Sequence, residues 1–115
     1  MVDKVIRWLG SSLDDLRAFP EQARRAAGYQ IRRVQQGLLP SDWKTMKAVG
    51  AGVYEIRVHT GTEHRVFYVA KYYDAIYVLH AFEKRTRQTR QADIALARQR
   101  LADLLELRRQ KLEVS

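Results

Sequence analysis

The sequence predicts an α+β domain in which helices pack on one face of an antiparallel sheet, in β-α-α-β-β-β-α order. Two separate stretches have apolar residues at three- and four-residue spacing, which is typical of amphipathic helices. Between them, residues 53–82 change to strand-like alternation and to runs rich in β-branched and aromatic residues. The 115 residues suffice for one hydrophobic core, so residues 1–115 are interpreted as a single domain.

The N-terminal part is predicted to form one short strand and two helices. The run 4–9 (KVIRWL) is β-like and ends at a Gly-Ser-Ser turn. Each of these serines precedes an aspartate by three residues, which favours a helix start, and the first helix is expected over 12–19. Pro20 suits the first turn of a second helix, which runs to about residue 36 and stops at Gly37. The apolar stripe of that helix contains Ala23, Ala27, Ile31 and Val34.

A three-stranded meander is predicted after residue 53. In its first strand the apolar positions alternate with Glu55, Arg57 and His59, so one face of the strand is polar. The connections are short, which favours antiparallel pairing of consecutive strands. The strands are expected over 53–59, 64–72 and 76–82, with a turn at 60–63.

The helical period returns from about Arg90. The predicted stripe contains Ile94, Ala97, Leu101, Leu104 or Leu105, and Leu112. Core packing is the first interpretation of this stripe, and a groove for a partner is the second.

The charge is strongly basic, with 21 Lys and Arg against 13 Asp and Glu, a net +8 and a pI near 10.1. Fifteen of the 21 are arginine, whose planar fork binds phosphate in a bidentate manner. Nucleic acid, an anionic membrane or an acidic partner would each suit this charge. No segment resembles a signal peptide or a membrane span, so a cytoplasmic protein that does not enter membranes is expected.

Several classes of chemistry are excluded by residue type. The absence of cysteine excludes disulfides and thiolate catalysis. The glycines of VGAGV lack the lysine and the strand–helix context of a P-loop. The three histidines lack metal-ligand spacing. No metal or cofactor is therefore expected.

Basic residues on the polar side of the meander are the main candidates for chemistry. Arg57, His59 and Arg65, with Lys84 and Arg85 at the end of the last strand, could line a concave surface that holds a phosphodiester backbone. The hairpin register decides whether Arg65 joins Arg57. The alternative is that these residues are ordinary solvated charges.

The three histidines are candidates for proton transfer, because imidazole titrates near neutral pH. His64 could equally be a surface residue of the hairpin. His80, inside the run IYVLHAF, fits a packed and hydrogen-bonded histidine better.

The runs YEIRVHTGTEHRVFYV and LHAFEKRTRQT, the second followed by an amphipathic helix, together resemble the RelE/ParE toxin superfamily. The stretch from Phe82 to Thr86 is similar to the Phe-x-Lys-Lys-Thr-like motif of the phage-derived HigB-like branch. The resemblance covers most of the chain and implies a RelE-like fold.

This resemblance implies a toxin of a type II toxin–antitoxin system that cleaves mRNA in the ribosomal A site. In such toxins a ribose 2′-hydroxyl attacks the adjacent phosphate, and basic residues stabilise the developing charge. An antitoxin with a helix-turn-helix DNA-binding domain is the implied partner, together with the ribosome and mRNA. We expect the antitoxin to cover the basic sheet surface or to block access to the ribosome.

Carried over position by position, Arg65 and Arg85 match the family arginines expected to stabilise transition-state charge, and Arg57 matches a basic residue that binds mRNA phosphate. Lys84 fits either role, and His64 and Lys47 complete the RNA-binding set. The family tyrosine early in the last helix has no counterpart near Gln91. The acid–base role therefore stays open, with His59, His64 and His80 as candidates.

Two other functions fit the same residues. A ParE-like inhibitor of DNA gyrase would use the fold without nuclease chemistry, and the missing tyrosine favours it. A binding module without catalysis would keep the basic surface and bind RNA in a salt-dependent manner.

Overall fold

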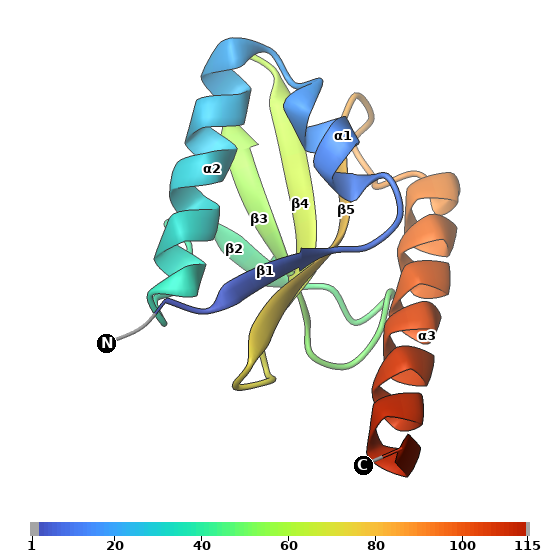
Figure 1. Ribbon diagram of the computed structural model, residues 1–115. Coiled ribbons are helices and arrows are strands. Elements are labelled where there is room, and N and C mark those ends of the chain that lie inside the picture. The colour runs from blue at the N-terminus through green and yellow to red at the C-terminus, as the bar shows by residue number, and fades with distance from the viewer. Residues whose placement is uncertain (1–2, 115) are drawn as a thin grey trace.

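The computed structural model describes residues 3–114, with the side chains of residues 3–112, and has the predicted α+β class. Three helices accompany a five-stranded sheet (Figure 1). The strand predicted over 53–59 is found at those residues, and the boundaries of the other predicted elements shift by a few residues. The elements are β1 (Val5–Trp8), α1 (Ser12–Arg17), α2 (Glu21–Gln35), β2 (Trp43–Thr45), β3 (Val53–His59), β4 (Glu63–Val69), β5 (Ala75–Glu83) and α3 (Gln91–Val114).

The sheet has the strand order β1-β5-β4-β3-β2. The predicted meander of β3, β4 and β5 is confirmed, and each of its pairings is antiparallel. The sheet as a whole is mixed, because β1 runs parallel to β5 with Val5 beside Ala75. Helices and other strands separate β1 from β5 in the chain, so no hairpin forces them to be antiparallel. The short edge strand β2 was not predicted, since three residues carry no detectable period.

The helices lie on both faces of the sheet, and the expectation that they share one face is wrong. Helices α1 and α2 pack with Val66, Tyr68 and Val78, whereas α3 packs with Phe67 and Leu79. Adjacent strand residues point to opposite faces, so these two clusters are the two sides of one sheet. Figure 1 shows α2 and α3 on either side of the strands. The physical reason is that β4 and β5 are apolar at consecutive positions, as strands buried on both faces are.

A turn glycine and two side-chain hydrogen bonds help to fix these elements. Gly61 adopts φ 91° in the turn between β3 and β4, a left-handed conformation that glycine adopts without steric cost. Helix α1 begins at Ser12 without a side-chain cap; instead the Ser11 hydroxyl donates to Asp15, 2.8 Å away. On the other face, Arg100 of α3 donates to the Leu79 carbonyl oxygen at 2.8 Å and so ties α3 to β5.

Candidate nucleic-acid interface

Strand register brings the predicted basic residues together on the α3 side of the sheet. Arg57 of β3 lies opposite Arg65 of β4, so the hairpin register places both arginines on one face. Lys44 of β2 lies opposite Glu55, two residues before Arg57 on β3 and therefore on the same face. Arg65 in turn lies opposite Phe82 of β5. We call this surface the basic sheet face; it contains Lys44, Glu55, Arg57, Arg65 and Lys84.

Glu55 is the centre of the basic sheet face. Its side chain is 4% exposed, and its Oε1 atom lies 3.5 Å from Arg57 Nε and 3.8 Å from Arg65 Nε. Burial raises the pKa of Glu55, and the nearby cations Arg65, Arg57, Lys84 and Lys44, in decreasing order, oppose that rise. Four cations around one carboxylate leave a local excess of positive charge.

The two arginines differ in access to solvent. The Arg65 side chain is 4% exposed and donates from Nη1 to the His64 carbonyl oxygen at 3.0 Å and to Glu63 at 3.2 Å. The Arg57 side chain is 34% exposed and reaches the surface. Within the described residues, the buried Nε atoms of both arginines lack a hydrogen-bond acceptor. Arg57 can therefore touch a ligand directly, whereas Arg65 contributes a fixed positive charge from beneath.

The two basic residues directly after β5, Lys84 and Arg85, have different surroundings. Lys84 lies close enough to Glu55 to oppose the rise of its pKa, and the Lys84 Nζ atom donates to the Arg87 carbonyl oxygen at 2.9 Å. Arg85 is 80% exposed at its side chain and pairs with Glu83 at 3.1 Å. Glu83 lies opposite His64, on the other face of the sheet. The structure therefore brings Lys84, but not Arg85, to the basic sheet face.

His59 is the accessible histidine of the three. It belongs to the polar side of β3, its side chain is 49% exposed, and its ring lies between two carboxylates. Nε2 is 2.6 Å from Asp42, and Nδ1 is 2.6 Å from Glu63. These two hydrogen bonds raise the pKa of His59 and favour the imidazolium form.

His64 and His80 are enclosed. His64 is 1% exposed on the α1–α2 side, 4.4 Å from Phe19 between ring centroids, so it is not a surface residue of the hairpin. Burial lowers its pKa. His80 is packed and hydrogen-bonded, as its place inside the run IYVLHAF favoured, with Nε2 2.8 Å from Asp93 of α3. His64 therefore lies on the side of the sheet opposite the basic sheet face, whereas His80 lies buried on the α3 side, with 4.8 Å between its ring centroid and that of Phe82.

Lysines from the β2 region extend the site. Lys47 is exposed after β2 and shares a shallow hollow of about 380 Å³ with Lys44. Sequence reasoning missed Lys44 as well as the central place of Glu55. The alternation along 53–59 did place Glu55 on the polar face, but nothing in the sequence identified the partner strand that carries Lys44.

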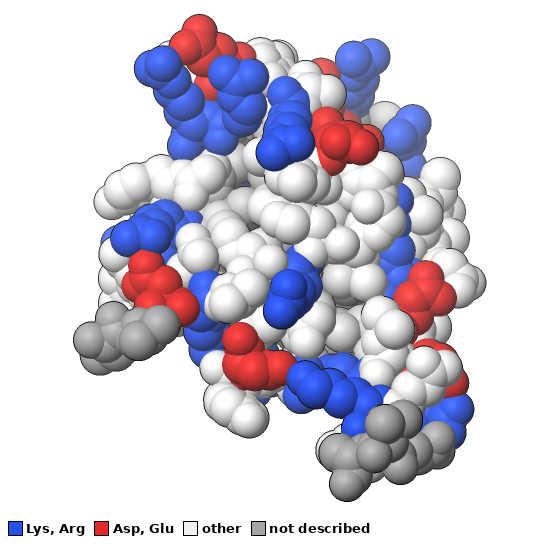
Figure 2. All heavy atoms as spheres, in the orientation of Figure 1, with Lys and Arg blue, Asp and Glu red and all other residues white. Residues whose placement is uncertain are grey.

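Basic side chains elsewhere are dispersed. Figure 2 shows blue groups mostly around the periphery of one side of the molecule, interleaved with red carboxylates, while the middle is largely uncharged. Among residues 3–114, no group of three His, Asp or Glu side chains could hold a metal ion. In the same part of the chain, no helix is long and apolar enough to cross a membrane.

The fold and the basic sheet face define a small α+β protein that is compatible with the RelE-like fold. Residues 14–102 match the family described as phage derived protein Gp49-like (DUF891), and the chain belongs to this family. This is a RelE/toxin-like family of toxin–antitoxin systems. The match confirms the predicted toxin superfamily, without assigning a branch of it, and implies an antitoxin partner. No curated protein matches the chain.

Proposed function

We propose that this protein is a toxin of the HigB-like branch that cleaves mRNA on the translating ribosome. The observation that carries the proposal is the cluster of four cations around the buried Glu55, from which Arg57 and Lys44 reach the surface. A phosphodiester gains charge during cleavage, and fixed cations in a partly desolvated site stabilise that charge strongly. The cytoplasm, where ribosomes translate, is the proposed location.

The proposed reaction needs only RNA and protein side chains. The ribose 2′-oxygen forms a bond to the adjacent phosphorus, its proton passes to a base, and the 5′-oxygen leaves with a proton from an acid. Arg57 and Lys84 hold the phosphate oxygens, and Arg65 adds its charge from below. Arg85 keeps a proposed role only if its exposed side chain turns from Glu83 towards the RNA.

His59 is the favoured group for proton transfer. Its ring is accessible, lies at the end of the row formed by Glu55 and Arg57, and is held by Asp42 and Glu63. In the imidazolium form it can give a proton to the leaving 5′-oxygen, and the neutral ring then takes up a proton from water, a step that the two adjacent carboxylates favour because they stabilise the imidazolium. His80 and His64 would need rearrangement to reach RNA, and Lys47 would extend phosphate binding beside Lys44.

Primer extension on a reporter mRNA in a purified translation system tests the proposal. Cuts within codons that require translating ribosomes would support the nuclease, and Arg57→Ala should weaken them. A matched control is Arg25→Ala, which removes an exposed arginine of α2. If the well-folded protein leaves the mRNA intact, the nuclease is excluded; trapped DNA breaks in a gyrase supercoiling assay would then indicate ParE-like action.

A further inference from the structure

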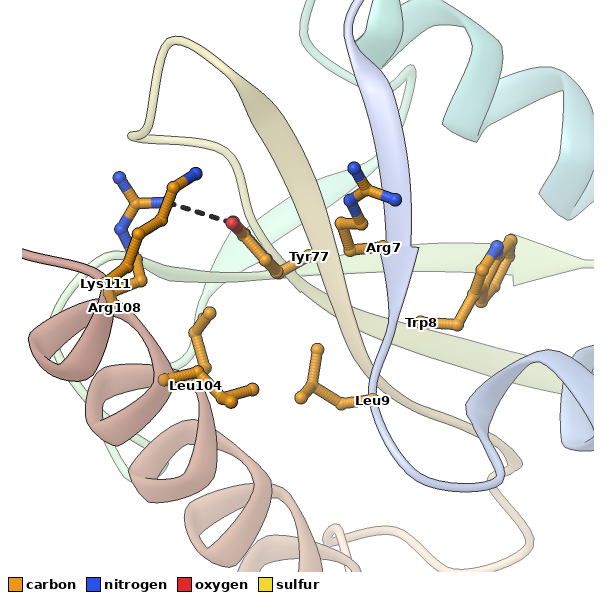
Figure 3. A pocket seen from close by; sticks show the side chains of 8 residues that line it. Arg7, Trp8, Leu9, Tyr77, Leu104, Arg108 and Lys111 are labelled. Atoms are coloured by element: carbon orange, nitrogen blue, oxygen red, sulfur yellow. Dashed lines mark hydrogen bonds between the residues drawn. The ribbon is translucent and has the colours of Figure 1, made fainter. Parts of the chain in front are cut away.

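A second surface hollow lies between β1, β5 and the C-terminal half of α3. Its volume is about 330 Å³, enough for one large side chain or two small ones (Figure 3). Leu9 and Leu104 form its apolar floor, and Tyr77 rises from β5 beside them. We call it the β1–α3 pocket.

The charges around the β1–α3 pocket are mostly positive. Arg7, Arg108 and Lys111 line it, and no acidic residue does. Asp74 is the nearby counter-ion, 3.3 Å from Arg108 and 4.0 Å from Lys111. Arg7 forms no ion pair or hydrogen bond with a side chain in the described part of the chain. Three cations against one carboxylate leave an excess that favours an anionic partner.

Arg108 is a rigid wall of the pocket. Its guanidinium carbon lies 3.7 Å from the centre of the Tyr72 ring, and Nη1 donates to the Tyr77 hydroxyl at 2.9 Å. Such stacking and hydrogen bonding fix the side chain before any partner arrives, so less conformational entropy is lost on binding.

The rim also exposes apolar surface. Leu107 borders the pocket and is 58% exposed, whereas Leu104 in the floor of the pocket is 1% exposed. An apolar rim next to fixed arginine and aromatic groups is the composition that protein interfaces favour.

We propose that the β1–α3 pocket binds an acidic segment of a partner protein, with one apolar side chain seated over Leu9 and Leu104 and carboxylates at Arg7 and Lys111. The occupant follows from charge complementarity: the chain carries +8, and this rim contains cations without a matching number of acids. Naming that partner as the antitoxin rests on the proposed function.

The pocket and the basic sheet face occupy different parts of the sheet. The pocket lies at β1 and β5, whereas Arg57 and Arg65 lie on β3 and β4. A partner segment in the pocket leaves these two arginines uncovered. Inhibition would then come from the bulk of the bound partner, which hinders access to the ribosome, rather than from neutralising the arginines.

A binding experiment with synthetic peptides tests the proposal. The probe is a fluorescein-labelled peptide of repeated Glu-Glu-Leu-Leu, compared with its Lys-Lys-Leu-Leu counterpart by fluorescence anisotropy. We expect the acidic peptide to bind, and Arg7→Glu combined with Lys111→Glu to weaken it about tenfold. Leu107→Ser should weaken it as well. Arg24→Glu combined with Arg25→Glu changes the net charge equally on the exposed face of α2 and should alter affinity less than about twofold.

Each other outcome contradicts the proposal. Equal losses in the pocket and control variants would mean that only net charge matters. A loss confined to Arg57→Glu, or displacement of the peptide by a short uridine oligonucleotide, would mean that it occupies an RNA surface. No binding of the acidic peptide would exclude the site, provided that thermal melting shows folded proteins. The pocket variants should still cut mRNA on ribosomes, because the pocket is not part of the proposed nuclease site. If the wild type cuts no mRNA, the proposed function fails; if the acidic peptide does not bind, the docking proposal fails. The two failures are therefore distinguishable.

Discussion

Arg57 and Arg65 lie directly opposite each other across the β3–β4 hairpin, and their Nε atoms lie 3.5 and 3.8 Å from the same oxygen of Glu55. Like charges at opposite positions of two strands normally repel. Here the carboxylate between them compensates part of that repulsion. The pair therefore forms a preorganised positive site whose charge Glu55 partly neutralises.

Removal of Arg65 should affect stability and activity together. Arg65→Ala leaves Glu55 buried with fewer compensating cations, and we expect a loss of about 3 kcal/mol in the free energy of unfolding. Urea denaturation measures this loss. Arg57→Ala, at a more exposed position, should cost less stability while lowering the rate of mRNA cleavage by about a hundredfold. Equal stability of the two variants would contradict the difference in burial.

Glu55→Gln should strengthen RNA binding. The substitution removes the negative charge among four cations and keeps the shape of the side chain. We expect the affinity for a short single-stranded RNA to rise about tenfold at low salt, and the gain to shrink as salt screens the charges. Filter binding over a salt series measures both effects. Glu21→Gln on α2 is the matched control and should leave affinity unchanged.

The raised pKa of Glu55 predicts that the free energy of unfolding depends on pH. Burial raises the pKa of Glu55 above the unfolded value of about 4.5, so the native state holds this proton more firmly than the unfolded state does. The stability contributed by Glu55 is therefore present at acidic pH and declines as pH rises through 4.5 towards the folded pKa. Glu55→Gln cannot titrate, so its stability relative to the wild type should rise over that interval. A constant difference between the two proteins from pH 4 to 8 would contradict the raised pKa.

His59 should change stability in the same sense, at higher pH. Hydrogen bonds that the ring donates to Asp42 and to Glu63, in decreasing order of effect, raise its pKa above 6.5. The stability gained by the imidazolium is fully present below pH 6.5 and is lost as pH rises through the folded pKa. NMR titration of the His59 ring should show the raised value, and Asp42→Asn should lower it. If cleavage depends on the imidazolium, the alkaline limb of the rate profile should shift to lower pH in Asp42→Asn.

Two adjacent leucines of α3 test how the helix packs. Leu104 is 1% exposed, whereas Leu105 is 46% exposed. Leu104→Ala should lower the free energy of unfolding by about 3 kcal/mol, because it removes buried methyl groups and leaves a cavity. Leu105→Ala should change it by less than about 1 kcal/mol. Thermal or urea unfolding measures the difference between the two variants, which have the same amino-acid composition.

The strands of the meander and the three helices could be predicted because each has a local signal: alternation or a β-branched and aromatic run in the strands, and capping residues or apolar spacing in the helices. The apolar runs of β4 and β5 indicate burial on both faces, but which helix covers Phe67 and Leu79 could not be predicted, since it depends on contacts between distant segments. The sequence also left Leu104 and Leu105 undecided, because both fall near the same helical stripe. Burial resolves that choice in favour of Leu104.

The candidate site was predictable in part. Alternation in β3 placed Glu55, Arg57 and His59 on one face, and the hairpin then decided that Arg65 belongs there. Arg85 was grouped with them because of its position after the last strand, yet a residue outside a strand is not bound by alternation. The short strand β2, and with it Lys44, gave no signal of its own.

The parallel pairing of β1 with β5 sets an order of assembly during synthesis. Val5 leaves the ribosome early, but its partner Ala75 follows only after two helices and three strands have been made. Contacts between residues so distant in sequence form slowly compared with those of a hairpin. The β3–β4 hairpin can therefore form first, and β1 can join the sheet only after β5 has been made. A nascent chain would thus carry Arg57 and Arg65 in register before its sheet is complete.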